Sequence, residues 1–278
     1  MRARNSLIRF DKLLIFTKQP PNQMINFFRK IRYNLMEQNK TGKYLKYGIG
    51  EIVLVVIGIL IALQINNWNE GRKSEMLEKS VLTDLRNELN ANISQLEYEI
   101  DQREGVLSAG RLLLEHSGPD ATWGLKINFD SILFKVVVSG WKFFPETGVV
   151  TDILSSGKLN IIQNDSLRYM ISSLPSDMAA MNDEDDTYRL DLHGYFLPFF
   201  SGNYPLRNIV EDRGLFGRNM DSGLSTFHID PESLLRNREL EGVLTIQSIW
   251  TNTAIAMYNS QMNKYKIMIR LINKKLES

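Results

Sequence analysis

The densest group of chemically capable side chains in this sequence is a run of four carboxylates, Asp183-Glu184-Asp185-Asp186. Such a run could supply oxygen ligands to calcium, or the acid and base of a hydrolase that acts on envelope polymers. In a helix, adjacent side chains point in different directions around the axis, so these four do not converge. We therefore interpret the run as a solvated helix face, with calcium binding and hydrolysis as the alternatives.

Other residues that could perform catalysis or bind a metal are scattered. His116, His193 and His228 lie far apart, outside any His-x-x-x-His spacing, and the chain has no cysteine for a thiolate site or a disulfide. No Gly-x-Ser-x-Gly elbow, phosphate-binding glycine loop or dinucleotide fingerprint is found. The sequence therefore names no catalytic, cofactor-binding or metal-binding residue, and an enzyme is not the leading interpretation.

One apolar run, residues 49–65, carries the strongest signal. A hydrocarbon core needs roughly 20 helical residues to cross it, and a helix from Tyr47 to Trp68 rises about 30 Å. These two aromatic residues would then lie at the two headgroup levels as interface anchors. Glu51 lies near one end, where a charge costs less than at the bilayer centre. We predict a transmembrane helix over residues 48–68, rather than a buried helix or strand of a soluble domain.

The flanking charges predict the orientation of this helix. Residues 1–47 hold 11 Lys or Arg against Asp11 and Glu37, a net charge of +9. Because the whole chain has a net charge of +1, the remainder carries −8. Lys and Arg collect on the cytoplasmic side, so the N-terminus is expected inside the cell and the large C-terminal part outside the cytoplasm. The basic segment is expected to contact anionic membrane lipid, and the acidic part argues against nucleic acid as a partner.

The N-terminal segment divides at Met24. Pro20-Pro21 ends any helix in residues 1–23, which we interpret as an extension upstream of a natural start at Met24, with a basic amphipathic membrane arm as the alternative. Residues 24–47 form the basic cytoplasmic segment. A cleaved signal peptide is the competing interpretation of residues 49–65, but no small-x-small cleavage pattern follows them. An uncleaved signal anchor fits better.

Three segments carry a resemblance that covers most of the chain from Met24 onward. They are residues 24–32 (MINFFRKIR), 47–70 (YGIGEIVLVVIGILIALQINNWNE) and 155–168 (SSGKLNIIQNDSLR). Together they resemble an uncharacterised family of single-span bacterial inner-membrane proteins, a domain of unknown function. The resemblance implies a short cytoplasmic N-terminus, one span in the inner membrane and a largely helical extracytoplasmic domain over residues 69–278. It implies no activity and no catalytic residue.

The pattern after the span predicts a long helix from about residue 74 to Glu115, which could continue directly from the membrane helix across Gly71. Its apolar residues recur mostly at three- and four-residue steps, which indicates core packing, with a coiled-coil dimer as the alternative. These residues are Leu82, Leu85, Leu89, Ile93, Leu96, Ile100 and Leu107. The helix should end at Ser117-Gly118-Pro119, because Gly permits a left-handed cap and Pro cannot continue a helix.

Shorter helices are expected between this helix and the C-terminus. Residues 129–138 form a helix or, because of three consecutive valines, a strand. A helix over residues 147–156 should close at Gly157, and Asn164 or Asp165 should cap the next one. Residues 176–200 continue helically and end near Pro198. The fold class is therefore all-α, one N-terminal transmembrane helix followed by a bundle of long helices.

A long loop and a last helix complete the chain. Residues 201–229 are rich in Gly, Asn, Pro and Asp, too long for an idle connection, and are either a functional surface or a weakly packed insertion. Asp230 before Pro231 is a strong helix start. The helix it begins should run to about Lys275 and pack antiparallel on the first extracytoplasmic helix.

Glu51, Gly58 and Ala62 lie on nearly the same face of the predicted span. A small-xxx-small pair lets two membrane helices approach closely, so this face is a candidate for self-association. The leading hypothesis is a signal-anchored accessory protein that binds a protein partner or ligand outside the cytoplasm, for assembly or sensing. The alternative is a membrane-tethered extracytoplasmic hydrolase.

Replacing Gly58 with Ile should lower the oligomeric mass of the chain in detergent, because a branched side chain holds the two helices apart. Light scattering of the purified protein measures this mass. An unchanged mass would exclude the Glu51, Gly58 and Ala62 face as the contact.

Overall fold

The computed structural model describes residues 29–30, 33, 41–124, 126–140, 142–211 and 223–278. It divides into two compact units, Met1–Gly71 and Arg72–Ser278, which we call the N-terminal and C-terminal units. The described residues are helical or irregular, and no strand occurs among them. The proposed extension, residues 1–23, lies outside the described residues. Most of the basic segment, residues 24–47, lies outside them too.

Helix α2, Thr41–Glu115, contributes to both units. Its part Gly48–Glu115 contains an apolar window long enough to cross a membrane, judged by length and composition alone, and none of that window is buried. The segment predicted to span a membrane is therefore not a short separate helix, as the boundaries 48–68 imply, but part of a much longer one. Gly71 does not interrupt it, because a glycine inside a helix costs only about 1 kcal/mol relative to alanine.

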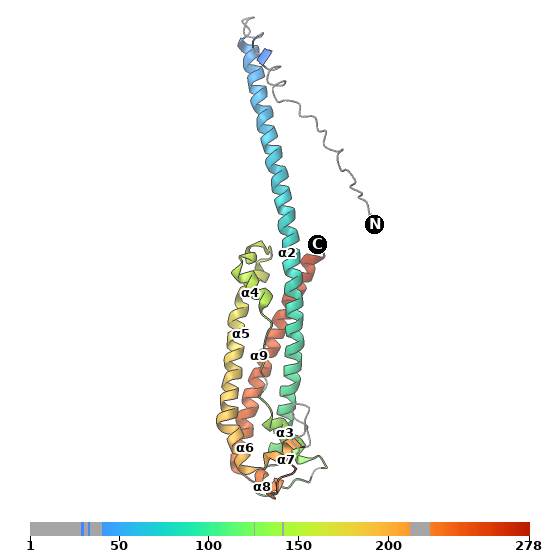
Figure 1. The fold of residues 1–278 in the computed structure, drawn as a ribbon, viewed down its shortest axis with the longest axis vertical. Coiled ribbons are helices and arrows are strands. Elements are labelled where there is room, and N and C mark those ends of the chain that lie inside the picture. The colour runs from blue at the N-terminus through green and yellow to red at the C-terminus, as the bar shows by residue number, and fades with distance from the viewer. Residues whose placement is uncertain (1–28, 31–32, 34–40, 125, 141, 212–222) are drawn as a thin grey trace, which may run out of the picture. The chain divides into compact units, whose positions relative to one another are not determined.

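The C-terminal unit is built on α2 and two further long helices, α5 (Asp165–Asp191) and α9 (Arg238–Leu276) (Figure 1). At one end, Lys275 near the end of α9 lies 3.3 Å from Glu78 on α2. Farther along both helices, Tyr258 contacts Arg103. Residue numbers thus fall along α9 as they rise along α2, which confirms the predicted antiparallel packing of these two helices.

Short helices connect and close the bundle. Helix α3 covers Phe129–Val137, so the helical interpretation of residues 129–138 is confirmed and the strand is excluded. Helix α4 covers Gly148–Ser155 and ends before Gly157, whose φ is +76°. The 3₁₀-helix η1, Lys158–Ile161, follows, and the side chain of Asn164 caps α5 as expected by accepting the Leu167 N–H at 2.9 Å.

Three predicted boundaries were wrong. The helix expected to end near Pro198 instead passes through a π-helical turn, η2 (Leu192–Phe196), into α6 (Leu197–Asn203). Pro198 fits there because it lies in the first turn of α6, where its missing N–H is tolerated.

The other two boundaries concern the loop and the last helix. The region 201–229 is not one loop, since it includes the end of α6 and helix α7 (Leu206–Glu211), while residues 212–222 lie outside the described part. The last helix is two helices, α8 (Pro231–Leu235) and α9, because Asn237 accepts the Glu239 N–H and starts α9 afresh.

The buried apolar side chains form two clusters along the bundle. The first joins the early part of α2 within the C-terminal unit to α4, the start of α5 and the C-terminal half of α9. The second joins the end of α2 to α3, η2, α6, α7, α8 and the first turns of α9. Residues around Arg103 on α2 and Asp185 on α5 lie between the two clusters, and both of these charged side chains are buried.

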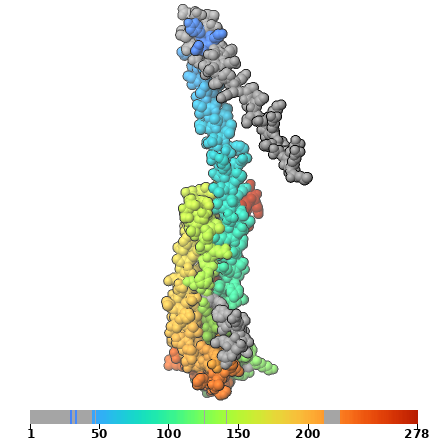
Figure 2. Space-filling view, viewed as in Figure 1, coloured from blue at the N-terminus to red at the C-terminus, as the bar shows by residue number. Residues whose placement is uncertain are grey.

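Residues 138–140 and 142–147, which we call the connecting segment, run irregularly between α3 and α4 and lie between α2 and α5 (Figure 2). Their backbone groups find partners on side chains of the long helices. Asn92 donates to the Glu146 carbonyl at 2.8 Å and accepts the Glu146 N–H at 2.7 Å. Just beyond the segment, the Glu88 carboxylate accepts the N–H groups of Val149 and Val150, at 2.5 and 3.1 Å. A carboxylate from another helix thus caps the N-terminus of α4.

Replacing Asn92 with Ala should destabilise the C-terminal unit by about 2 kcal/mol, because both backbone groups of Glu146 lose the partner that the buried Asn92 side chain supplies. Urea unfolding of the full chain in detergent measures the change. The control is Asn90→Ala, an exposed residue two positions away that bonds its own helix, where we expect a change within about 0.5 kcal/mol. Equal effects of the two substitutions would contradict this role of Asn92.

Candidate functional site

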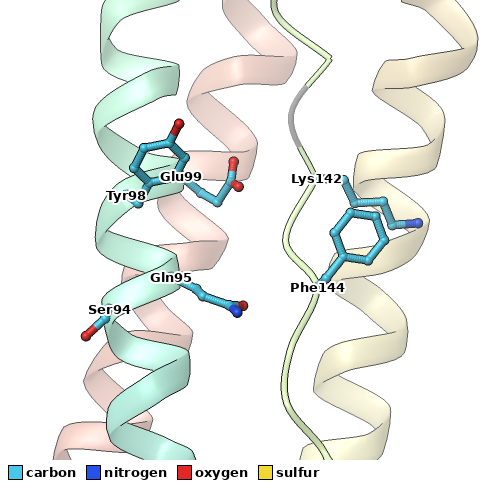
Figure 3. Close-up of a pocket in the computed structure, with 6 residues that line it drawn as sticks. All are labelled: Ser94, Gln95, Tyr98, Glu99, Lys142 and Phe144. Atoms are coloured by element: carbon cyan, nitrogen blue, oxygen red, sulfur yellow. The ribbon is translucent and has the colours of Figure 1, made fainter. Parts of the chain in front are cut away.

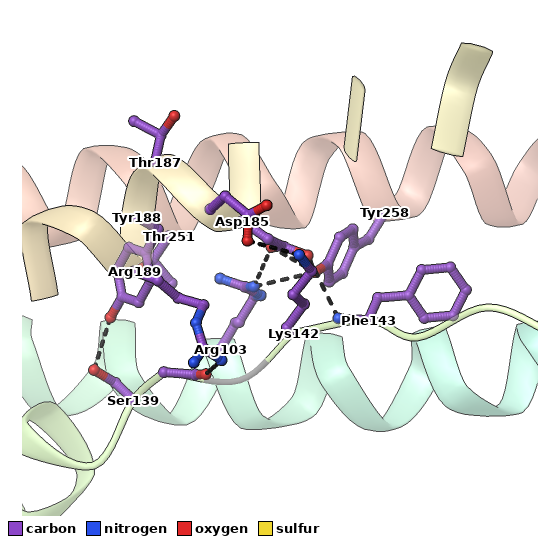
Figure 4. Close-up of polar contacts among 12 residues, drawn as sticks. Arg103, Ser139, Lys142, Phe143, Asp185, Thr187, Tyr188, Arg189, Thr251 and Tyr258 are labelled. Atoms are coloured by element: carbon purple, nitrogen blue, oxygen red, sulfur yellow. Dashed lines mark hydrogen bonds and ion pairs between the residues drawn. The ribbon is translucent and has the colours of Figure 1, made fainter. Parts of the chain in front are cut away.

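Four chain segments meet at the carboxylate of Asp185, a residue that is only 1% exposed (Figure 4). Arg103 on α2 donates from Nη2 to Oδ1 at 2.6 Å, and the Tyr258 hydroxyl on α9 donates to both carboxylate oxygens at 2.6–2.7 Å. The backbone N–H of Phe143 in the connecting segment approaches Oδ2 at 3.4 Å. We call Arg103, Asp185 and Tyr258 the polar node.

Arg103 lies between two tyrosine rings. Its guanidinium carbon is 5.0 Å from the ring centroid of Tyr258 and 5.7 Å from that of Tyr188, within the range of cation–π attraction. A buried arginine is costly unless its charge is paired and its donors are used. Here the ion pair with Asp185 and the two aromatic faces replace water around the charge.

The environment of Asp185 acts on its pKa in both directions. Burial raises the pKa of Asp185 above its ordinary value, and the Tyr258 hydrogen bond, the Arg103 charge, the Phe143 N–H and the Lys142 charge offset only part of that rise. The three direct partners are all donors, so the geometry matches an ionised carboxylate. Burial also raises the pKa of the Tyr258 hydroxyl, which keeps this group protonated as a donor to Asp185.

A second buried network continues from the node toward α3. Tyr188 donates to the Ser139 hydroxyl at 2.7 Å, and Gln247 on α9 donates to the Val136 carbonyl at 2.9 Å. Gly140 follows directly, and a Cβ at this position would lie 2.8 Å from a methyl group of Leu192. The start of the connecting segment is therefore fixed by side chains of α5 and α9, and a glycine stands where Leu192 of η2 leaves no room for a Cβ.

An open groove lies beside the node, between α2 and the connecting segment (Figure 3). It has a volume of about 400 Å³ and is lined by Ser94, Gln95, Tyr98, Glu99, Lys142 and Phe144. Two of these side chains are exposed aromatic rings, Tyr98 at 55% and Phe144 at 69%. Gln95 and Glu99 extend from α2 toward the segment that carries Phe144. The groove therefore offers aromatic faces, an amide and a carboxyl group to a bound molecule.

Glu99 connects the groove with the node. Burial raises its pKa, the Arg103 charge lowers it, and the Asp185 charge raises it again. Its Oε2 is buried and has no hydrogen-bond partner among the described residues. Lys142 lies on the other side of the groove. Its ammonium group forms an ion pair with Asp186 on α5 at 2.6 Å and not with Glu99.

The structure corrects the interpretation of the acidic run. Asp183 and Asp186 are exposed, as expected for a solvated face, but Asp185 is buried in the node. One carboxylate of the four points inward because α5 packs between two neighbours and a helix turns about 100° per residue. No group of three or more His, Cys, Asp or Glu side chains in the described residues could hold a metal ion.

The residues predicted for the membrane segment are distant in sequence from the groove and belong to the N-terminal unit. Glu51, Ala62 and Trp68 are exposed there, and a Cβ added at Gly58 would meet no described atom within 4 Å. The side chain of Tyr47 lies outside the described part. Helix association and interface anchoring therefore stay predictions.

Sequence reasoning missed the node and the groove, although one signal was present. The predicted apolar stripe of α2 places Ile100 and Leu107 on the same face, and Arg103 occupies the position between them. A charged residue inside an apolar stripe indicates a buried charge that needs a partner. Nothing local identified that partner, because Asp185 lies 82 residues later.

Residues 51–179 match a family model described as "Family of unknown function (DUF6090)". This agrees with the resemblance to an uncharacterised family. The matched part includes Glu88, Asn92, Glu99 and Arg103 but ends before Asp185 and Tyr258. Neither a curated protein nor a solved structure matches the chain.

Replacing Asp185 with Asn should destabilise the C-terminal unit by about 3–5 kcal/mol, because Arg103 is left buried without a counter-charge. Asp186→Asn is the matched control on the next residue. It removes an exposed ion pair with Lys142, for which we expect less than about 1 kcal/mol. Urea unfolding of the full chain measures both, and a control as damaging as Asp185→Asn would contradict the assignment.

Proposed function

We propose that this protein is a membrane-anchored accessory protein whose C-terminal unit binds a partner or ligand outside the cytoplasm, for assembly or sensing. The observation that carries the proposal is α2. One helix supplies an apolar stretch with exposed side chains over residues 49–65 and, farther along, the buried stripe that organises the C-terminal unit.

The exposed apolar stretch supports the anchoring part of the proposal. Soluble monomers seldom expose apolar patches of more than a few hundred Å². Here leucine, isoleucine and valine side chains are exposed around the whole helix, as shown by Ile52, Leu54 and Leu60, each more than half exposed. A lipid environment removes the cost of that exposure, and the charge difference between residues 1–47 and the remainder favours a cytoplasmic N-terminus.

The groove and the node support binding rather than catalysis. Asp185 and Arg103 form an ion pair with each other and are buried inside the bundle, so neither is available to a substrate. The groove presents aromatic and polar side chains without a nucleophile activated by a neighbouring base among its described lining residues. No specific observation favours the alternative of an extracytoplasmic hydrolase.

The partner predictions fit the same proposal. Membrane lipid would surround the apolar part of α2, and a second copy could associate through Glu51, Gly58 and Ala62. Any signal would pass to a partner in the membrane or the cytoplasm.

A fusion of alkaline phosphatase to the C-terminus of the chain begun at Met24 tests the orientation, because this reporter folds only outside the cytoplasm. We expect high phosphatase activity in bacterial cells, and low activity from a cytoplasm-only reporter fused at the same position. The reverse pattern would place the C-terminal unit in the cytoplasm and overturn the proposal. Recovery of an active fusion protein in the soluble fraction instead of the membrane fraction would overturn the anchoring itself.

A further inference from the structure

We propose that the groove between α2 and the connecting segment binds a protonated amine, with Glu99 as the acceptor and the rings of Tyr98 and Phe144 beside the positive charge. This inference rests on the proposed binding role and names the chemical class of the ligand. It does not depend on which side of a membrane the C-terminal unit occupies.

Glu99 supplies the reason for a cationic group. Its Oε2 is buried without a described hydrogen-bond partner, and a half-buried carboxyl in that position gains from a donor that brings positive charge. Arg103 attracts Glu99 but is already paired with Asp185 at 2.6 Å, and the Asp185 charge acts on Glu99 in the opposite sense. The protein's own cation at the node therefore does not satisfy this carboxyl.

Lys142 does not complete the site either. It lines the groove, but its ammonium group is 2.6 Å from Asp186, and its side chain points away from Glu99 (Figure 3). Asp186 thus holds the neighbouring cation on the α5 side. Among the lining residues of the groove, Glu99 is therefore the carboxyl group whose charge a ligand can pair with.

The two exposed rings favour an amine over a bare metal ion. Tyr98 comes from α2 and Phe144 from the connecting segment, and each ring is more than half exposed. Phe143, the residue before Phe144, is buried instead. Aromatic faces attract an organic cation and also pack against its hydrocarbon part. The amide of Gln95, which extends toward the same space, could accept a second N–H of an ammonium group.

The volume limits the size of the ligand group. A groove of about 400 Å³ is at the small end of ligand pockets, which suits a primary amine on a short chain. Such an amine occurs on a lysine side chain or a small polyamine, and also on an aminated lipid headgroup. The shared chemistry is an ammonium group on an aliphatic carbon.

The direct test uses n-butylamine as the probe and 1-butanol as its uncharged analogue. The full chain, purified in dodecyl maltoside at pH 8, is titrated with each and observed by saturation-transfer NMR of the small molecule. We expect butylamine to bind and 1-butanol to bind at least about tenfold more weakly, equivalent to about 1.4 kcal/mol, the size of a partly desolvated cation–π or charge-assisted contact. Equal binding of the two probes would overturn the proposal.

Variants locate the site. Glu99→Gln should weaken butylamine binding about tenfold, whereas Glu97→Gln, two residues away on α2 and paired with Lys266 at 3.7 Å, should leave it unchanged. Phe144→Ala removes an exposed ring that the fold does not need and should weaken binding severalfold at an unchanged melting temperature. Wild-type affinity in both Glu99→Gln and Phe144→Ala would overturn the proposal, even if either variant were destabilised.

Two vesicle preparations distinguish the sources of the amine. In phosphatidylglycerol vesicles, which contain no amine, butylamine should bind in a Glu99-dependent manner. Loss of this binding in vesicles with phosphatidylethanolamine would assign the groove to a lipid headgroup, and unchanged binding would assign it to a soluble or peptide amine. Absence of Glu99-dependent binding in both would overturn the amine assignment, while the reporter fusion would still decide the anchoring and orientation separately.

Discussion

The buried ion pair of Arg103 and Asp185 is the constraint on which the rest of the C-terminal unit depends. It lies between two apolar clusters, where neither charge can reach water, so α2 and α5 must keep the one register in which the pair forms. Tyr258 adds α9 to the same point, and Phe143 adds the connecting segment. A packed apolar core alone would tolerate sliding of the helices far better than this arrangement does.

The same principle extends along α2. Glu78, Glu88 and Asn92 are buried on this helix, and each bonds backbone groups of segments that have no regular structure or that begin a helix. Buried backbone N–H and C=O groups need partners, and here side chains supply what a strand or a longer helix would supply elsewhere. The connecting segment can therefore remain extended and still carry Phe144 and Lys142 to the rim of the groove.

The sequence predicted the helices well where local signals exist. The apolar period of α2, the φ-positive Gly157 and the Asn164 cap each act over a few residues, so their effects are readable without a fold. Asn237 was missed, although an Asn two residues before Glu239 is also a local cap signal. The node and the groove could not be predicted, because Arg103, Phe143, Asp185 and Tyr258 meet only after three long helices and an irregular segment have packed.

The most direct test of this account is a double-mutant cycle on the ion pair, with Arg103→Met, Asp185→Leu and the combined variant unfolded by urea in the full chain. Each single substitution leaves a buried charge without its partner, so each should cost several kcal/mol, whereas the double variant removes both charges. We predict that the double variant is less destabilised than the sum of the single variants by about 2–3 kcal/mol. Additive effects would show that the two charges act independently and would contradict the central role of the pair.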